Sequence, residues 1–173
     1  MEYQRFYFFY AEWGGGIKNF IHCGGKAEFS PIRYFNYAES IENFNVNFFS
    51  CCEIISTLLK KPNKPHLENI ILISSISGIR GYKGSSIYGA SKACLDSITR
   101  SLCDELSPQI KINSIVLGNI NTKSTMHLES LKPSPIGEGK SEDVGNLVDF
   151  LLKSGYLNGQ NIVLDGGRST IGN

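Results

Sequence analysis

The sequence has no excess of charge of either sign. Seventeen Lys and Arg residues stand against sixteen Asp and Glu residues, so the formal net charge of the 173-residue chain is +1. Because nucleic-acid binding depends on neutralising phosphate charges, we expect no nucleic-acid partner. Charged residues make up 19% of the chain and hydrophobic residues 41%, which is typical of a folded globular domain.

Regular cysteine spacing and long apolar runs are also missing. The cysteines are odd in number, and they show neither the pattern of a secreted disulfide framework nor the paired spacing of a metal site; they are Cys23, Cys51, Cys52, Cys94 and Cys103. The aromatic run at 6–10 is too short to cross a bilayer and lacks the features of a signal peptide. We therefore expect reduced, mostly buried thiols, no metal, no membrane segment and a cytoplasmic location.

What the sequence does contain is an alternation of strand and helix patterns. Runs of β-branched and other apolar residues predict strands at 18–22, 69–73, 110–116 and 161–164. Apolar residues at helical spacing predict helices at 41–60, 86–106 and 141–154. This order favours parallel strands joined by helical crossovers, with helices on both faces of the sheet. The fold class is therefore α/β: a doubly wound parallel sheet of about four strands, with ligand groups at the carboxyl ends of the strands.

One connection is unusually long. Residues 121–140 contain Pro133 and Pro135 together with several Ser and Gly residues. A loop of this length in a compact domain is usually functional or mobile, so we interpret 121–140 as a lid over the site. The alternative is a solvated insertion without a role.

The strongest local pattern is Tyr88-Gly89-Ala90-Ser91-Lys92, near the start of the predicted helix 86–106. Residues four apart lie on one face of a helix, so the Tyr88 phenol and the Lys92 ammonium point into the same space. A nearby cation lowers the pKa of a phenol from its usual value of about 10. The pair therefore has the chemistry of an acid and base near neutral pH. The alternative is an ordinary tyrosine and a solvated lysine at a helix start.

A serine hydroxyl is expected beside this pair. Ser75 follows the predicted strand 69–73, thirteen positions before Tyr88. A hydroxyl at the carboxyl end of a strand can bind the same substrate oxygen that Tyr88 protonates. Ser74 is the competitor, but adjacent residues on a strand point to opposite faces.

Together, Ile73-Ser74-Ser75, Gly78 and the Tyr88 to Lys92 motif resemble the signature of the short-chain dehydrogenase/reductase family. The resemblance is strongest to the 3-oxoacyl-carrier-protein reductases and covers approximately residues 17–167. It implies that 1–173 is a single, partial, truncated Rossmann-like domain, in which 1–16 is an atypical N-terminal segment and 121–140 is the lid.

The resemblance implies catalytic roles for Ser75, Tyr88, Lys92 and Asn47. Tyr88 would protonate a carbonyl oxygen, and Ser75 would hydrogen-bond that oxygen. Lys92 would lower the pKa of the Tyr88 phenol and bind the nicotinamide ribose. Asn47 would connect Lys92 to solvent through water. Asn45 is the rival assignment for this asparagine, but Asn47 keeps the family's spacing to the serine better.

The resemblance also implies a nicotinamide cofactor, NAD or NADP. The segment from Ile21 to Gly25 is similar to the family's Asn-Asn-Ala-Gly turn, of which only Gly25 matches strictly. The segment from Leu117 to Thr122 is similar to the family's Pro-Gly-x-x-x-Thr segment, with leucine in place of proline. The implied cofactor-binding residues are Gly25, Ile73, Tyr88, Lys92, Leu117, Gly118, Ile120 and Thr122.

The family's glycine-rich phosphate loop is the part that has no counterpart. Members of the family begin with a strand, a glycine-rich turn and a helix, and then two more strands, whereas only about two dozen residues precede Gly25. The run Gly14-Gly15-Gly16 does not serve as that loop, because a strand rather than a helix is predicted after it. We therefore expect this chain to lack the phosphate-binding loop that precedes the Gly25 position in its relatives.

Two functions remain open. The first is an NAD(P)-dependent oxidoreductase acting on a small carbonyl or alcohol substrate. The second is a non-catalytic, truncated paralogue or fragment that acts as an oligomerisation scaffold. The resemblance implies a homo-oligomer formed through the helices from Asn47 to Lys60 and from Tyr88 to Leu106, although their apolar residues can equally pack on the sheet.

Overall fold

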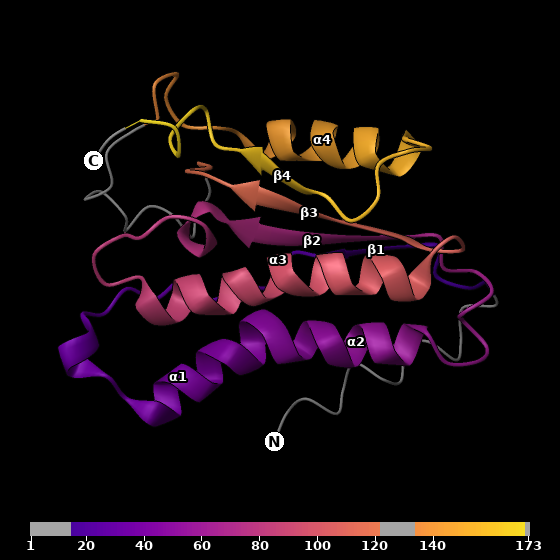
Figure 1. The fold of residues 1–173 in the computed structure, drawn as a ribbon, viewed down its shortest axis with the longest axis horizontal. Helices are drawn as coiled ribbons and strands as arrows, with labels where there is room; N and C mark the ends of the chain where they lie inside the picture. The colour runs from indigo at the N-terminus through magenta and orange to yellow at the C-terminus, as the bar shows by residue number, and fades with distance from the viewer. Residues whose placement is uncertain (1–14, 122–133, 172–173) are drawn as a thin grey trace.

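The protein is described by a computed structural model that covers residues 15–121 and 134–171. Its centre is one parallel sheet in which the spatial order β1-β2-β3-β4 is also the order along the chain (Figure 1). The strands are β1 (Asn19–His22), β2 (Asn69–Ser75), β3 (Lys111–Leu117) and β4 (Asn161–Leu164). All four predicted strands are confirmed, and each bound lies within two residues of the prediction. Because all strands run the same way, their carboxyl ends meet at one edge of the sheet.

The helices also follow the predicted order, with one difference. The helices are α1 (Tyr37–Phe44), α2 (Ser50–Leu58), α3 (Ser86–Leu106) and α4 (Ser141–Lys153). The predicted helix 41–60 begins earlier because the Asn36 side chain caps it, accepting from the backbone N–H of Ala38 at 3.0 Å. It is also interrupted by a π-helical segment, Asn45–Phe49, which separates α1 from α2. Helical spacing alone predicts neither feature.

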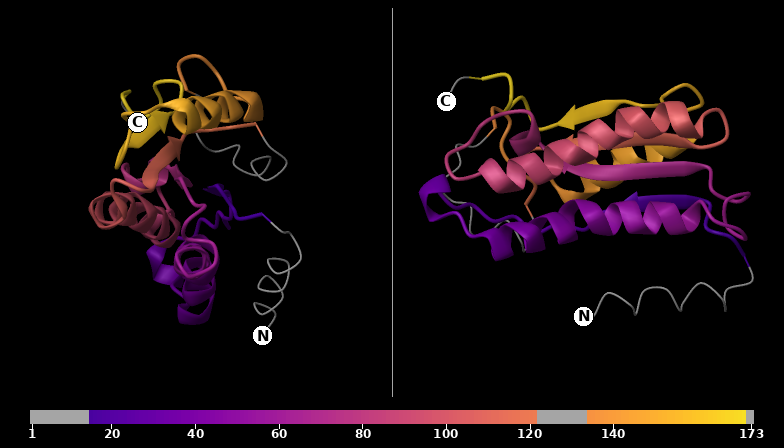
Figure 2. Two further views of the ribbon diagram at one scale, coloured as in Figure 1. Left: turned by 90° about the vertical axis from the view of Figure 1, so that its right-hand side faces the viewer. Right: turned by 60° about the horizontal axis from the view of Figure 1, so that its bottom comes forward.

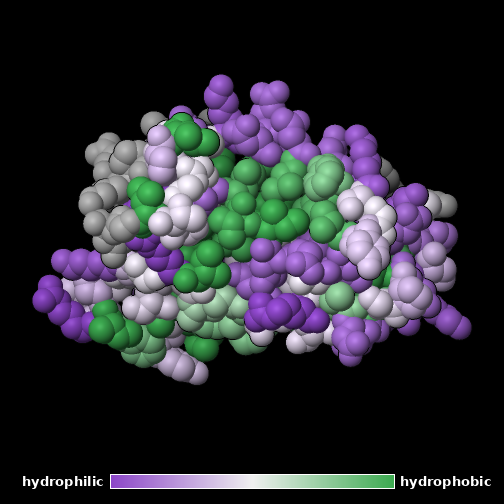
Figure 3. Space-filling model, turned by 45° about the horizontal axis from the view of Figure 1, so that its top comes forward, coloured by the Kyte–Doolittle hydropathy of each residue, from purple (hydrophilic) through white to green (hydrophobic). Residues whose placement is uncertain are grey.

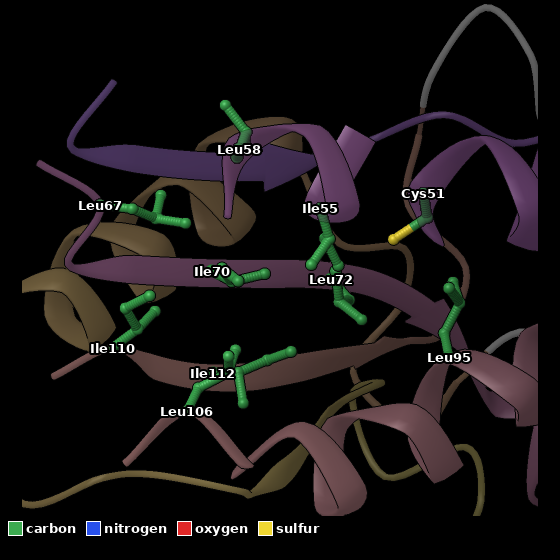
Figure 4. Packing of buried hydrophobic residues seen from close by; sticks show 10 residues of the cluster. All are labelled: Cys51, Ile55, Leu58, Leu67, Ile70, Leu72, Leu95, Leu106, Ile110 and Ile112. Atoms are coloured by element: carbon green, nitrogen blue, oxygen red, sulfur yellow. The ribbon is translucent and has the colours of Figure 1, made fainter. Parts of the chain in front are cut away.

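Helices cover both faces of the sheet, as the doubly wound prediction requires. α1, α2 and α3 lie on one face and α4 lies on the other (Figures 1 and 2). The side chains of β2 alternate between the two cores: Ile70 and Leu72 pack under α2 and α3, whereas Ile71 packs under α4. This explains the uninterrupted apolar run of β2, since a strand buried on both faces has no polar side. Figure 4 shows the larger core, in which each fully buried Leu or Ile contributes roughly 1.5–3 kcal/mol.

The start of α3 approaches the turn after β2 very closely. A Cβ atom at Gly89 would lie 2.3 Å from the carbonyl oxygen of Ser77, and one at Gly78 would lie 2.9 Å from the backbone nitrogen of Ala93. Only glycine fits at both positions. The close contact fixes the first turn of α3 against the carboxyl end of β2, and so places Tyr88 near Ser75.

The β4 edge of the sheet carries an apolar surface. Figure 3 shows this area between the polar outer faces of α3 and α4. In β4 itself, Val163 is 44% exposed, while Ile162 and Leu164 are half-buried. An apolar strand at the edge of a sheet is a surface on which a further chain can pair.

Candidate active site

Ser75 and Tyr88 meet at the carboxyl edge of the sheet. Ser75 is the last residue of β2, and its hydroxyl accepts a hydrogen bond from the Ser77 backbone at 3.2 Å. The Tyr88 side chain, in the first turn of α3, is hydrogen-bonded to the Ser75 side chain. The Tyr88 ring also packs against Phe29, with 5.6 Å between the ring centroids. The structure therefore brings together the hydroxyl and the phenol that the sequence pairs.

Ser74 points the other way. Its hydroxyl donates to the carbonyl oxygen of Lys92 at 3.2 Å and is buried between β2 and α3. This is the opposite-face geometry expected of neighbouring strand residues. Ser74 thus attaches the strand to the helix, whereas Ser75 lies beside Tyr88.

Lys92 is buried behind the Ser75–Tyr88 pair. Its side chain is only 4% exposed, and its ammonium nitrogen donates to the Ile73 carbonyl oxygen at 2.9 Å. Burial lowers the pKa of Lys92 to about 8, although the nearby Cys51, Asp96 and Cys23 favour the charged form. Ile73, a predicted cofactor residue, therefore holds Lys92 through its backbone.

This burial makes the stability of the protein depend on pH. The unfolded chain holds the Lys92 proton up to a pKa near 10.5, but the folded chain loses it near 8, so the stability of the folded state rises with pH between these values. Below about pH 8 the charged lysine costs roughly 3 kcal/mol. Between about pH 7 and about pH 11, the free energy of unfolding of the wild type is expected to rise by roughly 3 kcal/mol more than that of Lys92→Met, which has no lysine to titrate at this position. Urea unfolding of both proteins at each pH measures this difference, and parallel pH profiles would contradict it.

The expected lowering of the Tyr88 pKa by Lys92 is wrong for this structure. Burial raises the pKa of Tyr88, and the hydrogen bond with Ser75 lowers it only in part. The desolvation of the phenolate therefore outweighs the stabilisation that the motif alone suggests. Tyr88 is a protonated phenol at neutral pH.

Asn47 lies at the centre of a buried hydrogen-bond network. Its Oδ1 accepts from the Lys26 backbone nitrogen at 2.6 Å, and its Nδ2 lies 2.8 Å from the Ser91 hydroxyl, 3.0 Å from Asn43 Oδ1 and 3.2 Å from the Lys26 carbonyl. Asn43 donates to the same carbonyl at 3.0 Å. The network holds the turn after β1 against the π-helical segment. Among the described residues, no side-chain hydrogen bond involves the rival Asn45.

Three participants of this site were not predicted. Asn43 is four residues before Asn47, a spacing that brings the two amides onto one helix face and is the signal available in the sequence. Ser91 joins the network to α3, because its hydroxyl donates to the Tyr88 carbonyl at 2.7 Å. Asp96, one turn beyond Lys92, is buried and accepts from the Ser114 hydroxyl at 2.7 Å. Nothing in the sequence indicates the Ser114 contact.

The remaining predicted cofactor residues lie at the same edge where they are described. Gly25 follows β1, and a Cβ there would lie 3.1 Å from Lys92 Nζ. Leu117 ends β3, and Gly118 packs so closely on the turn after β4 that a Cβ would lie 2.7 Å from Asp165 Cα. Ile120 is buried and pairs with Gly139. Thr122 lies outside the described residues.

The two described ends of the predicted lid are joined. The backbone nitrogen of Asn121 donates to the Gly139 carbonyl at 2.8 Å, and that of Gly139 donates to the Asn119 carbonyl at 2.9 Å. Residues 122–133 lie outside the described residues, so the lid stays a prediction.

The glycines near the start of the chain lie away from this site. Gly15 and Gly16 precede β1, at the amino end of the sheet, and a Cβ at Gly16 would lie 2.1 Å from the His66 ring. The Ile17 backbone nitrogen is bound there by the Asn63 side chain at 2.6 Å. A ligand at the carboxyl edge cannot be reached from these glycines.

Residues 15–121 and 134–171 contain neither a candidate membrane span nor a candidate metal site. No helix in this part is long and apolar enough to cross a membrane. No group of three or more His, Cys, Asp or Glu side chains in it is arranged to hold a metal ion. The candidate site contains the Ser75 hydroxyl, the Tyr88 phenol, the Lys92 ammonium and the Asn47 amide.

A parallel sheet with helices on both faces, and a serine–tyrosine pair at its carboxyl edge, defines the protein as a Rossmann-like α/β protein. Its sequence matches the model of the family described as Enoyl-(Acyl carrier protein) reductase over residues 3–169. The chain belongs to the short-chain dehydrogenase/reductase family, as the sequence predicts.

Curated relatives and solved structures agree with this assignment. The chain is 37% identical over 158 residues to Carbonyl reductase family member 4 of Xenopus laevis. The matched stretch covers 88% of this chain and 67% of that protein. The chain is 32% identical over 158 residues to the 3-oxoacyl-[acyl-carrier-protein] reductase of Bos taurus, with the same coverage. A structure of a 4-hydroxyisoleucine dehydrogenase mutant complexed with NADH and succinate has a TM-score of 0.84 at 24% identity, covering 92% of this chain and 71% of that one. Against Carbonyl reductase family member 4 of Danio rerio, the match spans only 45% of the relative.

Proposed function

We propose that the protein is an NAD(P)-dependent oxidoreductase that interconverts a small carbonyl compound and its alcohol. The observation that carries the proposal is the hydrogen-bonded pair of Ser75 and Tyr88 at the carboxyl edge of the sheet, with Lys92 one helical turn away. Ligands of open parallel α/β sheets bind at this edge. A phenol and a hydroxyl side by side there suit the binding of a single reacting oxygen.

In the reductive direction, each of these residues has a distinct role in converting the carbonyl to the alcohol. Because the Tyr88 phenol is protonated at neutral pH, it donates its proton to the carbonyl oxygen of the substrate. The Ser75 hydroxyl donates a hydrogen bond to the same oxygen as negative charge develops on it. Lys92 places a positive charge near the phenolate that Tyr88 becomes, and offers its ammonium to the ribose. A bound nicotinamide supplies the hydride.

The described residues fit the nicotinamide end of NAD or NADP. Gly25 lies after β1, and the Leu117, Gly118 and Ile120 segment lies at the end of β3, so both are at the carboxyl edge where ligands of such sheets bind. Gly15 and Gly16 do not fit the phosphates, because they lie at the opposite end of the sheet. Proposed holders of the nicotinamide are therefore Gly25, Ile73, Tyr88, Lys92, Leu117, Gly118, Ile120 and Thr122.

Cofactor binding is the direct test. We expect saturable binding of NADH or NADPH in calorimetric titrations, and about tenfold weaker binding by Lys92→Met, since a lost hydrogen bond from a charged group costs roughly 1.5 kcal/mol or more. Lys64→Met is the matched control, because this exposed lysine lies between α2 and β2, at the amino end of the sheet. Absence of binding of either nucleotide at millimolar concentration would overturn the oxidoreductase proposal.

A non-catalytic scaffold is the second candidate, supported by the apolar face beside α2. Ile41 is 39% exposed and Phe49 is 47% exposed, and the Phe49 ring contacts those of Phe44 and Phe48. The helices from Asn47 to Lys60 and from Tyr88 to Leu106 are the proposed surface for a homo-oligomer, because Ile98 and Leu102 are also only partly buried. Sedimentation velocity tests this proposal, and a monomer at all concentrations would exclude it.

A cytoplasmic location remains part of the proposal. All five cysteines are free, which suits a reducing compartment. The thiols are less buried than the sequence suggests: only Cys51 is fully buried, and burial first, with Cys52 adding to it, raises its pKa to about 12, whereas Cys23 is exposed.

A further inference from the structure

His22 is a buried histidine at the site for which the proposed chemistry has no use. It is the last residue of β1, opposite Leu72 of β2, and is 5% exposed. Within the described residues, its Nε2 atom is buried and has no hydrogen-bond partner. A buried acceptor or donor without a partner costs roughly 1–3 kcal/mol, so its retention calls for an explanation.

The turn after β1 brings this imidazole and the Lys92 ammonium close to each other. A Cβ at Gly24 would lie 3.0 Å from His22 Cε1 and 3.5 Å from Nε2. A Cβ at Gly25, the next residue, would lie 3.1 Å from Lys92 Nζ and 3.8 Å from Asn47 Oδ1. The imidazole and the ammonium thus lie beside neighbouring residues of the turn after β1, where an added Cβ would pack tightly against each of them.

The hydrogen-bonding capacities of the two groups are complementary. An ammonium has three N–H donors, and the Ile73 carbonyl takes one of them. A neutral imidazole has one acceptor nitrogen. We infer that His22 is a positioning residue, whose Nε2 atom accepts a hydrogen bond from one water that in turn accepts a second N–H of the Lys92 ammonium, and so holds the charged group in place for Tyr88.

The charges around His22 favour the neutral imidazole that this role requires. Burial lowers the pKa of His22, the positive charge of Lys92 lowers it further, and the backbone of Asn47 opposes the shift. The other titratable groups near the pair are Cys23 in the turn, Cys51 on α2, and Tyr88 and Asp96 on α3. Asp96 supplies a negative charge, but it acts on Lys92, whereas burial and the charge of Lys92 are the main influences on the pKa of His22 and both lower it.

The inference rests on the proposed function for its purpose, but its test needs neither cofactor nor turnover. The Lys92 titration is followed by NMR with lysine labelled at Cε and is assigned with Lys92→Met. In His22→Phe, which keeps a ring but loses the acceptor, the midpoint for Lys92 is expected to fall by roughly one pH unit. In His22→Gln, which keeps an acceptor, most of the shift is expected to be restored. His66→Phe is the matched control, since His66 lies at the amino end of β1, and should leave the midpoint unchanged.

A reciprocal measurement keeps the inference testable if His22→Phe does not fold. In the otherwise native protein, the His22 ring is expected to titrate below pH 6.5, and its midpoint should rise in Lys92→Met, where the positive charge is gone. A His22 midpoint that Lys92→Met does not move, or a Lys92 midpoint equal in His22→Phe and wild type, would overturn the role of His22. Failure to bind nucleotide would instead overturn the proposed function and leave these titrations unaffected.

Discussion

Tyr88→Phe is expected to abolish turnover while leaving nucleotide binding nearly unchanged. The phenol is the only group at the carboxyl edge that is both protonated at neutral pH and hydrogen-bonded to Ser75, among the residues described. A positioned acid contributes on the order of 10²–10⁴-fold to a rate, so we expect a loss of at least that size. Phenylalanine keeps the ring that packs against Phe29, so the fold should be retained. Steady-state kinetics and calorimetric nucleotide titration of the same preparation measure the two effects.

Tyr34→Phe is the control for this change. Tyr34 is 62% exposed on the short 3₁₀ turn before α1, and its hydroxyl is expected to play no part in the reaction. If Tyr88→Phe retained the wild-type rate, the assignment of Tyr88 as the proton donor would be wrong. If both variants lost activity together, the loss would instead reflect a general disturbance of the fold.

Asn47→Ala is expected to cost roughly 3 kcal/mol of stability or more. Its side chain is fully buried, and its removal leaves the Lys26 backbone N–H and the Asn43 amide oxygen without their bonds to Asn47. Each buried polar group that loses its partner costs roughly 1–3 kcal/mol. Urea unfolding measures the effect as a lower midpoint at an unchanged slope. The turn with Gly24 and Gly25 should loosen with it, so nucleotide binding should weaken as well.

Asn45→Ala is the control for Asn47→Ala. It shows how much stability is lost when an asparagine of the same helical segment is replaced without breaking the hydrogen-bond network. Asn45 is two residues away in the same π-helical segment, is half-buried, and makes no side-chain hydrogen bond with the described residues. Its replacement is expected to change stability by less than about 0.5 kcal/mol. Equal costs for Asn45→Ala and Asn47→Ala would show that Asn47 has no special role.

The fold could be predicted because each element carries its own periodic pattern. β2 is a continuous apolar run, and α3 has apolar residues at helical spacing between Ser86 and Leu106, so both were found with bounds close to those of the structure. The π-helical segment Asn45–Phe49 was not found, since its backbone depends on how Asn47 and Asn43 bind Lys26 across 21 and 17 residues. Such contacts between distant segments leave no periodic signal.

The site could be predicted only in part, for a related reason. Ser75, Tyr88 and Lys92 are linked by fixed spacing along one strand and one helix, so the sequence is enough to bring them together. The pKa of Tyr88 depends on burial, which the spacing does not reveal, and its direction was predicted wrongly. His22 was seen only as a mismatch in a family turn. Its unpartnered nitrogen is visible only once β1 is placed beside α3.

The strand order of the sheet bears on how the protein folds. Because β1, β2, β3 and β4 are neighbours in space in the same order as along the chain, each strand can be added to the one made just before it. No strand has to be inserted between two that have already paired, and each crossover closes a loop to the adjacent strand only. Assembly can thus proceed as a growing edge, and the part of the sheet that carries Ser75 and Lys92 is complete once β2 and α3 have joined β1.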